Sequence, residues 1–568
     1  MAAIRSASID VVAAVAAIFA AAASGFVANV LVQFREATHT HYVAARSRGI
    51  KGFFLRHMPE VMSTEPAAMA EIRFFNEARA AGKKAALYGM TCFHPTYTLV
   101  DPVDVQYVLV KRAGFYPKPG VYEALKLFIG EHGLVTERDE AKHAIMRRLV
   151  NPAFKTVFLK SLSANVFQPG VAALLQDLRS RIQSHATTPD QATADEDDQQ
   201  TDRPGSRALL EVESTLTAFA LRVICKAAFR FHDEKAVETI SNGFFALTAL
   251  LQEAPWLLVP AASRVPHSAL TRVIAALDTQ KRNIRVIIDA MRRDQKKGQQ
   301  QQPPASPIRS RPDAPNDADD DGHDETGATV DASDRLIDIM LREQQLTDDV
   351  VISHGVTFLF AGHDTTSLTL NSACYCLARY PEVQNRLFEE IASCVAFNTI
   401  PTYDTVSDLV YLDSFLREVL RLHCPVTGFG RLPIEDDVLP SGLFLPKGHE
   451  IWFSIVALQR LPEFYGADAE NFRPERWCDD VEDRAAFINR AEQYSMAYLP
   501  FSIGKRNCIG KDFAMMELKV CTAALVRQLQ FALIAANYVK PPDVQGVTRR
   551  PATPIELLVS IRDGADAE

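Results

Sequence analysis

The chain has 568 residues, of which 61 are lysine or arginine and 70 are aspartate or glutamate, so its net charge is −9. Hydrophobic residues make up 47% and charged residues 23%, which is the composition of an ordinary globular protein. This composition excludes a wholly disordered, collagen-like or disulfide-scaffold chain, and the presence of a single long apolar run excludes a multispanning membrane protein.

The first expected element is a membrane anchor over residues 1–34. The run from Val11 to Val32 carries no charge, and at 1.5 Å per residue it would span about 33 Å as a helix, enough to cross a bilayer. The alternative is a cleaved signal peptide, whose apolar region is normally shorter. Four basic residues follow the run within residues 35–51 and only Arg5 precedes it, so the positive-inside rule places the rest of the chain in the cytosol.

Two polar stretches, residues 186–206 and 298–333, are expected to be disordered insertions in a catalytic domain that covers residues 35–568. The first holds six acids and one base, and the second holds eight acids and two bases. Both are almost free of large apolar residues, so they cannot bury enough surface to offset the entropy of ordering. Without them the remainder is close to neutral, and we expect no nucleic-acid partner.

Residues 347–379 are predicted to form one long helix with Thr347 as its N-cap. The middle of this helix contains poor helix formers, and such local conflicts tend to mark functional positions. Gly362 would let a cofactor or ligand approach the backbone, and the Thr365 hydroxyl can compete for the carbonyl of Ala361. A functional site is therefore expected at the middle of the helix.

The segment Phe501–Gly510, which reads FSIGKRNCIG, precedes a predicted helix over residues 512–529. Cys508 lies at the end of this glycine-containing loop, where the helix N-terminus and Arg506 favour a thiolate. Gly504 and the last glycine of the segment permit a tight turn and a close approach to a flat ligand. A thiolate in such a loop is a suitable ligand for iron.

This loop resembles the signature of the cytochrome P-450 superfamily of heme-thiolate monooxygenases, in its eukaryotic microsomal type. The signature is Phe-x-x-Gly-x-Arg-x-Cys-x-Gly, and all five fixed positions match. The resemblance extends from about residue 50 to 568. It implies a mainly α fold with small β-sheets, a heme b cofactor, Cys508 as the axial ligand of the heme iron, and heme contacts from Phe501, Arg506 and Gly362.

The pair Asp364-Thr365 resembles the oxygen-activation motif of the same superfamily. The resemblance implies that the two residues are catalytic and deliver protons during oxygen activation. It also implies that Glu418 and Arg421, which lie three residues apart, form a buried structural triad with Arg476. The role of this triad would be to support the cysteine loop.

The resemblance also implies cationic partners for the heme propionates. Arg431 lies at the usual place for one of them, and the helix that opens near residue 140 carries His143 and Arg147. Many members of the superfamily have tryptophan where this chain has His143, and both side chains can donate a ring N–H.

The wall of the substrate pocket is expected to come from several separated apolar segments. Each aromatic residue in them has the alternative of being an ordinary core residue. A further apolar stretch, residues 254–260, could dip into the membrane interface. The expected pocket contacts are Phe128, Phe244, Phe245, Phe358 and Phe429.

The expected function is insertion of one oxygen atom from O2 into an apolar substrate, for which a weak similarity points to fatty acids or other lipids. The resemblance implies electrons from NADPH-cytochrome P450 reductase, with cytochrome b5 as a further partner, and a location at the endoplasmic reticulum membrane. Two alternatives stay open. One is a heme-thiolate isomerase or dehydratase acting on peroxides, and the other is a non-catalytic heme-binding membrane protein.

Overall fold

The computed structural model describes residues 40–42, 69–91, 94–185, 207–229, 231, 234–253, 268–301, 336–343, 346–478 and 496–562. The predicted anchor, the insertion at 186–206 and the stretch 254–260 lie outside these ranges. In the part of the chain that they cover, no helix is both long enough and apolar enough to cross a membrane. Residues 298–301 of the second predicted insertion are helical, as the end of a helix that reaches Gln301, and residues 302–333 lie outside the described ranges.

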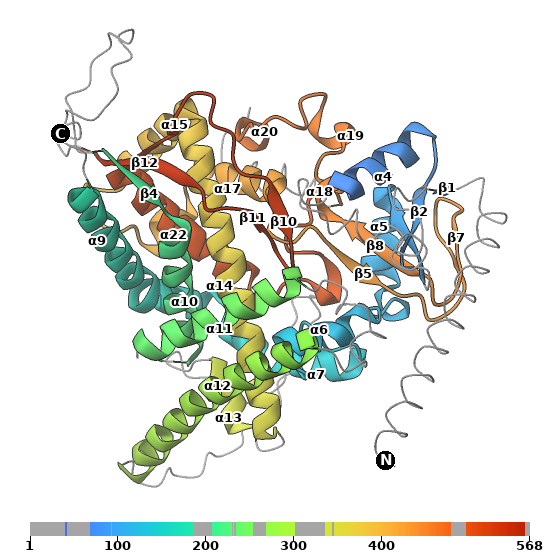
Figure 1. Ribbon diagram of the computed structural model, residues 1–568, viewed down its shortest axis with the longest axis horizontal. Helices are drawn as coiled ribbons and strands as arrows, with labels where there is room; N and C mark the ends of the chain where they lie inside the picture. Colours follow the sequence, from blue (N-terminus) through green and yellow to red (C-terminus); the bar gives the residue numbers. More distant parts are fainter. Residues whose placement is uncertain are drawn as a thin grey trace, which may run out of the picture.

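The fold is mainly helical, as the resemblance implies (Figure 1). The helices of the first half are α4 (Met69–Ala80), α5 (Pro102–Gln106), α6 (Val121–Ile129), α7 (Glu140–Val150), α8 (Thr156–Leu162), α9 (Gln168–His185), α10 (Glu213–Phe229), α11 (Glu234–Glu253) and α12 (Ser268–Gln301). Those of the second half are α13 (Leu336–Arg342), α14 (Asp348–Arg379), α15 (Pro381–Ala392), α16 (Tyr403–Ser407), α17 (Val410–Leu422), α18 (Ile455–Leu458), α19 (Pro462–Tyr465), α20 (Glu475–Cys478) and α22 (Lys511–Gln528).

The strands of the described residues form four sheets. The largest has the order β1-β2-β3-β8-β5, with β1 (Thr40–Tyr42), β2 (Ala85–Thr91), β3 (His94–Leu99), β8 (Glu450–Ser454) and β5 (Gly428–Arg431). A second joins β4 (Arg207–Glu211), β12 (Glu556–Ile561) and β9 (Leu529–Ala532), all antiparallel. The other two are the hairpins β6 (Asp437–Val438) with β7 (Phe444–Leu445), and β10 (Asp543–Gln545) with β11 (Arg549–Pro551).

Helix α14 runs through the middle of the helical part, with α10, α17 and α22 around it (Figure 1). Its bounds match the prediction closely, with Thr347 as the N-cap, although the Thr347 side chain makes no capping hydrogen bond. Helix α10 approaches very closely, since a side chain at Gly362 would come within 2.8 Å of Ile224. The two helices therefore form a tightly packed pair at the centre of the fold.

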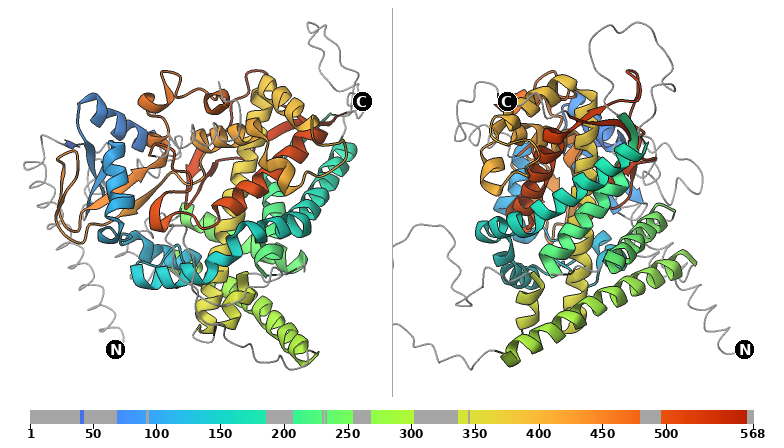
Figure 2. Two further views of the ribbon diagram at one scale, coloured as in Figure 1. Left: turned by 180° about the vertical axis from the view of Figure 1, so that it is seen from behind. Right: turned by 90° about the vertical axis from the view of Figure 1, so that its left-hand side faces the viewer.

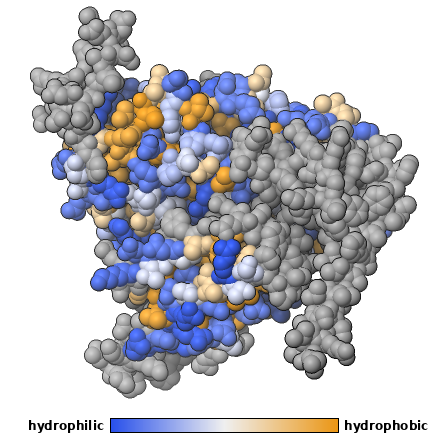
Figure 3. All heavy atoms as spheres, viewed as in Figure 1, coloured by the Kyte–Doolittle hydropathy of each residue, from blue (hydrophilic) through white to orange (hydrophobic). Residues whose placement is uncertain are grey.

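The core consists of two clusters of buried residues. One fills the helical part around α10, α14 and α22, and the other lies under the five-stranded sheet. Figure 2 shows these two parts side by side, the sheet at one end and the helices at the other. The loop that holds Cys508 begins at Leu499, in the sheet cluster, and ends at Phe513, in the helical cluster. On the face shown in Figure 3, hydrophilic residues predominate over the described helices, with hydrophobic groups gathered near one edge.

Candidate heme-thiolate site

The cysteine loop is shaped by its own backbone. The Cys508 N–H donates to the Phe501 carbonyl oxygen at 2.8 Å, which closes the loop. Gly504 has a φ of 72°, in the left-handed region, and a side chain there would lie 2.2 Å from the Leu109 carbonyl oxygen. Gly504 is thus required by the turn and by close packing against Leu109. Cys508 itself is exposed, unlike the buried cysteines of the helical core such as Cys521.

The electrostatics of the cysteine differ in part from the prediction. Desolvation by the surrounding protein is the largest influence and raises the pKa of the Cys508 thiol, whereas the Gly510 N–H and Arg147 lower it. Arg506, which was expected to favour the thiolate, instead forms an ion pair with Glu140 at 2.8 Å. Coordination to a metal ion would deprotonate the thiol regardless of these shifts.

Several cations gather beside the loop. Arg147, on α7, donates to the Asn507 carbonyl oxygen at 2.7 Å and so joins α7 to the loop. Arg431, on β5, is buried, and the only hydrogen bond found for it within the described residues goes to the carbonyl oxygen of Gly430. Burial and the nearby charge of Arg506 lower the pKa of Arg431. This cluster therefore has an excess of positive charge.

His143 belongs to the same cluster. It is buried on α7, and burial together with Arg506 and further cations lowers its pKa to about 3, so that it is neutral at pH 7. A neutral imidazole has one N–H to donate, so His143 can replace the N–H donor that tryptophan provides at this position in many members of the superfamily. His143, Arg147, Arg431 and Arg506 are thus brought together from three separate parts of the chain.

Lys118 is a member of this cluster that the sequence did not reveal. It is buried and donates to the carbonyl oxygens of Leu134 at 3.0 Å and Val135 at 2.8 Å. Burial, with Arg506 and Arg431, lowers its pKa well below the ordinary value. The only local signal is a lysine between two prolines before a helix, which does not distinguish it from a loop residue. Mutually destabilised buried cations fit a site that receives an anion.

The face of α14 that carries Phe358 and, by helical spacing, Thr365 is linked to the cysteine loop through Phe154. Thr365 Oγ1 donates to the Ala361 carbonyl oxygen at 2.8 Å, the competition with the helix that the sequence predicts. One turn before Ala361, the ring of Phe358 lies 6.1 Å from that of Phe154. Phe154 in turn lies against Gly510, beside the Cys508 sulfur. Gly362, by contrast, faces Ile224, so its missing side chain is explained by helix packing.

Asp364 points away from Thr365. Consecutive residues of a helix do not share a face, and the Asp364 carboxylate accepts hydrogen bonds from Thr548 at 2.5 Å and Arg550 at 2.5 Å. These two residues belong to the region of the β10–β11 hairpin, nearly 190 positions later in the chain. This ion pair could not be predicted from the sequence, because the two partners are far apart along the chain.

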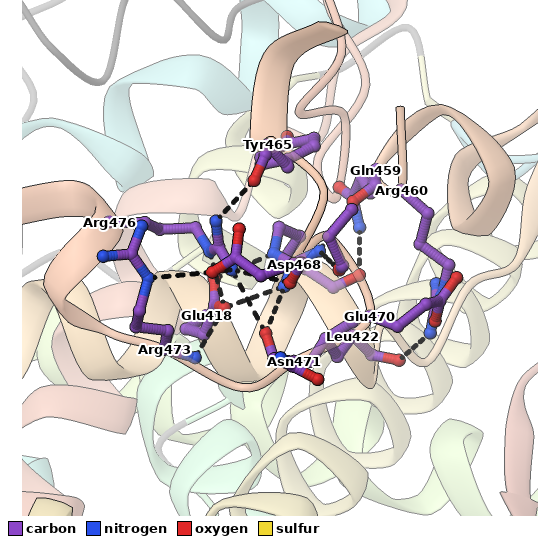
Figure 4. A network of polar contacts seen from close by, with 12 residues as sticks. Glu418, Leu422, Gln459, Arg460, Tyr465, Asp468, Glu470, Asn471, Arg473 and Arg476 are labelled. Atoms are coloured by element: carbon purple, nitrogen blue, oxygen red, sulfur yellow. Dashed lines mark hydrogen bonds and ion pairs between the residues drawn. The ribbon is translucent and has the colours of Figure 1, made fainter. Parts of the chain in front are cut away.

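The expected triad is assembled and buried, and Figure 4 shows Glu418 and Arg476 within the surrounding polar network. Arg421 Nη2 lies 2.8 Å from Glu418 Oε1, and Arg476 Nε lies 2.9 Å from the same oxygen. Trp477, which the sequence did not reveal, donates its indole N–H to Glu418 Oε2 at 2.9 Å. Although desolvation opposes it, Arg421 and Arg476 hold the pKa of Glu418 below its usual value.

Two side chains connect the triad to the irregular segment that precedes the cysteine loop. Gln459 donates to the Arg421 carbonyl oxygen at 2.9 Å and accepts from the Leu499 N–H at 3.1 Å. Tyr465 accepts a bond from Arg476 through its carbonyl oxygen at 2.8 Å and donates its hydroxyl to the Ala497 carbonyl oxygen at 3.0 Å. Through these two side chains, the triad helps to fix the position of the segment that precedes the cysteine loop.

The expected pocket contacts fall into three groups. Phe358 lies on the face that carries Thr365, while Phe128 and Phe429 are buried in the two core clusters, with Phe429 stacked on Phe453 at 5.2 Å. Phe244 packs against Phe360 and His363, which lie on the opposite side of α14 from Thr365, so the prediction that it lines the pocket is wrong. The side chain of Phe245 lies outside the described residues.

An accessible cysteine, with an excess of buried cations along one edge, fits an anionic heme held by a thiolate. The donor set fits the cofactor, since Cys508 suits the iron and Lys118, His143, Arg147 and Arg431 suit two propionates.

Comparison with known proteins agrees with a heme-thiolate site. The family model for cytochrome P450 matches residues 86–559, and the chain belongs to the cytochrome P450 family. The chain is 28% identical to Cytochrome P450 monooxygenase 91 of Postia placenta over 80% of its own length and 84% of the relative's. It is 33% identical to a Cytokinin hydroxylase of Arabidopsis thaliana over 42% of this chain, and 36% identical to Cytochrome P450 3A29 of Sus scrofa over 39% of it. The chain spans less than half the length of these last two relatives: 45% of the Cytokinin hydroxylase and 42% of Cytochrome P450 3A29.

Membership establishes the class of reaction and the cofactor. The chain is an oxidoreductase of the monooxygenase class that uses heme b, a redox partner, O2 and a small-molecule substrate. When bound, the heme supplies the binding and reductive activation of dioxygen. The cysteine and the cationic side chains described above would hold it.

Proposed function

We propose that this chain oxidises an apolar, lipid-like substrate with electrons from an NADPH-dependent reductase, at the cytosolic face of the endoplasmic reticulum membrane. One oxygen atom of O2 enters a C–H bond of the substrate and the other leaves as water, at the expense of two electrons and two protons. The observation that supports this proposal is that the face of α14 with Phe358 and Thr365 is linked through Phe154 to the loop of Cys508. A peroxide isomerase needs Cys508 but not the Thr365 face.

The test is turnover of the heme-loaded full chain with two oxidant systems and a panel of fatty acids, sterols and alkanes. We expect product with reductase and NADPH in the presence of O2. Product from organic peroxides alone, without NADPH, would favour the isomerase or dehydratase instead. Heme binding without product in either system would favour a non-catalytic role.

Thr365→Ala is expected to uncouple electron consumption from product formation. The Thr365 hydroxyl is bonded to the Ala361 carbonyl oxygen and lies on the helix face that is linked to the cysteine loop, so it is placed to hold a water that delivers protons in order. Without it, NADPH consumption continues while hydrogen peroxide replaces product. The measurement is product formed per NADPH consumed. Thr369→Ala is the matched control, because Thr369 makes the same type of bond one turn later, to the Thr365 carbonyl oxygen at 2.8 Å.

Asp364→Asn is expected to slow NADPH consumption and product formation together. The carboxylate is the acid nearest to Thr365 in the chain, and Asn keeps its size but not its charge or its ion pair with Arg550. The expected loss is about a hundredfold, the lower end of what general acid catalysis contributes. Thr548→Val, which removes only one hydrogen bond from the acid, should have a much smaller effect. Unchanged turnover of the Asn variant would assign the proton supply to another group.

Deletion of residues 1–34 is expected to reduce membrane association and leave heme binding intact. The proposal of an anchor rests on the uncharged run of residues 11–32 and the basic residues after it. Flotation of the full and shortened chains with microsomal membranes measures the difference. Protection of the catalytic domain from protease in sealed microsomes would contradict a cytosolic orientation.

A further inference from the structure

A second histidine of α14, His354, is buried without using its polar atoms. Its side chain is 1% exposed, and neither ring nitrogen has a hydrogen-bond partner among the described residues. His363 on the same helix differs, since its Nδ1 lies 2.7 Å from the Leu359 carbonyl oxygen. An unsatisfied buried polar atom costs about 1–3 kcal/mol. A group that the described residues do not provide is therefore expected to complete the hydrogen bonding of His354.

The position of His354 places it toward the heme-thiolate site. It precedes Phe358 by four residues and Ala361 by seven, spacings that bring these residues and Thr365 onto one helix face. The imidazole stacks on the Phe358 ring with centroids 6.1 Å apart, and Phe358 is the residue that contacts Phe154 above Gly510. His354 therefore lies on the same helix face as Thr365, eleven residues before it, with the apolar Phe358 and Ala361 between them.

The loop between α6 and α7 covers the neighbouring face of α14. A side chain at Gly130 would lie 2.7 Å from the Ser353 carbonyl oxygen, and one at Gly133 would overlap the Thr357 hydroxyl. The exposed His132 of this loop is the titratable group that acts on His354. Burial, with a smaller effect of His132, lowers the pKa of His354 to about 4. At neutral pH the imidazole is uncharged, with one donor and one acceptor nitrogen.

We propose that His354 is a specificity-determining residue, which hydrogen-bonds a neutral oxygen function, a hydroxyl or a carbonyl, at the end of the substrate remote from the carbon that is oxidised. At 1.5 Å per residue, His354 lies about 10 Å along α14 from Ala361 and about 16 Å from Thr365. The preferred substrate is thus an elongated apolar molecule with one uncharged polar end. This inference rests on the proposed function and narrows its substrate class.

The test uses the full chain loaded with heme, in preparations whose reduced carbon monoxide spectrum shows thiolate ligation. Straight-chain primary alcohols of increasing length, and the alkanes of the same lengths, are titrated against the shift of the heme absorption band. Wild type is expected to bind the longer alcohols more tightly than the matching alkanes. His354→Phe should weaken alcohol binding about tenfold and leave alkane binding within a factor of about two, the difference that one buried hydrogen bond makes. His354→Gln, which keeps a donor and an acceptor, should restore much of the preference.

His363→Phe is the matched control. It also removes a buried imidazole from α14, but the imidazole of His363 already has a hydrogen-bond partner within the helix. It should change alcohol and alkane affinity by the same factor. An equal change for both ligands in His354→Phe, or no preference for alcohols in wild type, would overturn the proposal. If His354→Phe fails to load heme, the comparison of His354→Gln with His354→Leu decides. These binding measurements need no turnover, so an inactive protein that still shows the preference would overturn the proposed function and not the role of His354.

Discussion

Cys508→His is expected to abolish the long-wavelength absorption band of the reduced protein with carbon monoxide. A thiolate donates more electron density to heme iron than an imidazole, and that band reports thiolate ligation. The loop should keep its shape in the variant, because the Cys508 N–H bond to the Phe501 carbonyl oxygen and the packing of Gly504 on Leu109 do not involve the sulfur. Monooxygenase turnover should be lost with the band.

The control for this substitution is Cys394→Ser. Cys394 is also exposed, and its sulfur donates to carbonyl oxygens of α15, so the spectrum and turnover should be unchanged. An imidazole-type spectrum in wild type would show that the axial ligand is not Cys508.

Glu418→Ala is expected to destabilise the fold by about 3–5 kcal/mol, the cost of leaving one side of a buried ion pair without its partner. Two guanidinium groups, those of Arg421 and Arg476, would lose their carboxylate at once, and Trp477 would lose the acceptor for its indole N–H. Because the same network holds Leu499 and Ala497, heme retention should fall with stability. Denaturant unfolding and heme content per protein measure the two effects.

A matched control is Asp349→Ala. Asp349 pairs with Arg285 at 3.1 Å on the surface, where both side chains are more than half exposed, and such pairs contribute at most about 1 kcal/mol. The pH dependence gives a second check with Glu418→Gln. Since the folded-state pKa of Glu418 is lowered, its stabilising contribution is present at neutral pH and is lost as the pH falls through that value. The gap between wild type and the Gln variant should therefore narrow on acidification, and a gap independent of pH would contradict a charged Glu418.

The long periodic elements could be predicted from the sequence to within a residue or two. The helix expected at 347–379 is α14, and the one expected at 512–529 is α22 (Lys511–Gln528). Capping residues, helical spacing of apolar residues and a following proline are local signals, and they suffice for such elements. The cysteine loop was identifiable because five fixed positions fall within ten residues.

What could not be predicted depends on contacts between distant segments. Arg550 meets Asp364, and Gln459 meets Leu499, through the tertiary fold alone. The prediction for Phe244 was wrong for a related reason. An apolar pattern indicates that a residue is buried, but not which side of α14 it contacts. The requirement for glycine at position 362 also comes from a distant segment. It is explained by close packing against Ile224 of α10 and not by the motif around Gly362.

The amide of Gln459 has a consequence for engineering this chain. The Gln459 amide donates to carbonyl oxygens at the end of α17 and accepts from the Leu499 N–H before the cysteine loop, so together with Tyr465 it couples the buried ion network to the segment that carries Cys508. A substitution that moves the cysteine loop through these contacts would also change the geometry of the buried ion network. Conversely, a change in the network would alter the position of the Cys508 sulfur. Directed evolution of this protein should therefore find activity and thermal resistance linked at Gln459, and separable only at positions on the α14 side of the site.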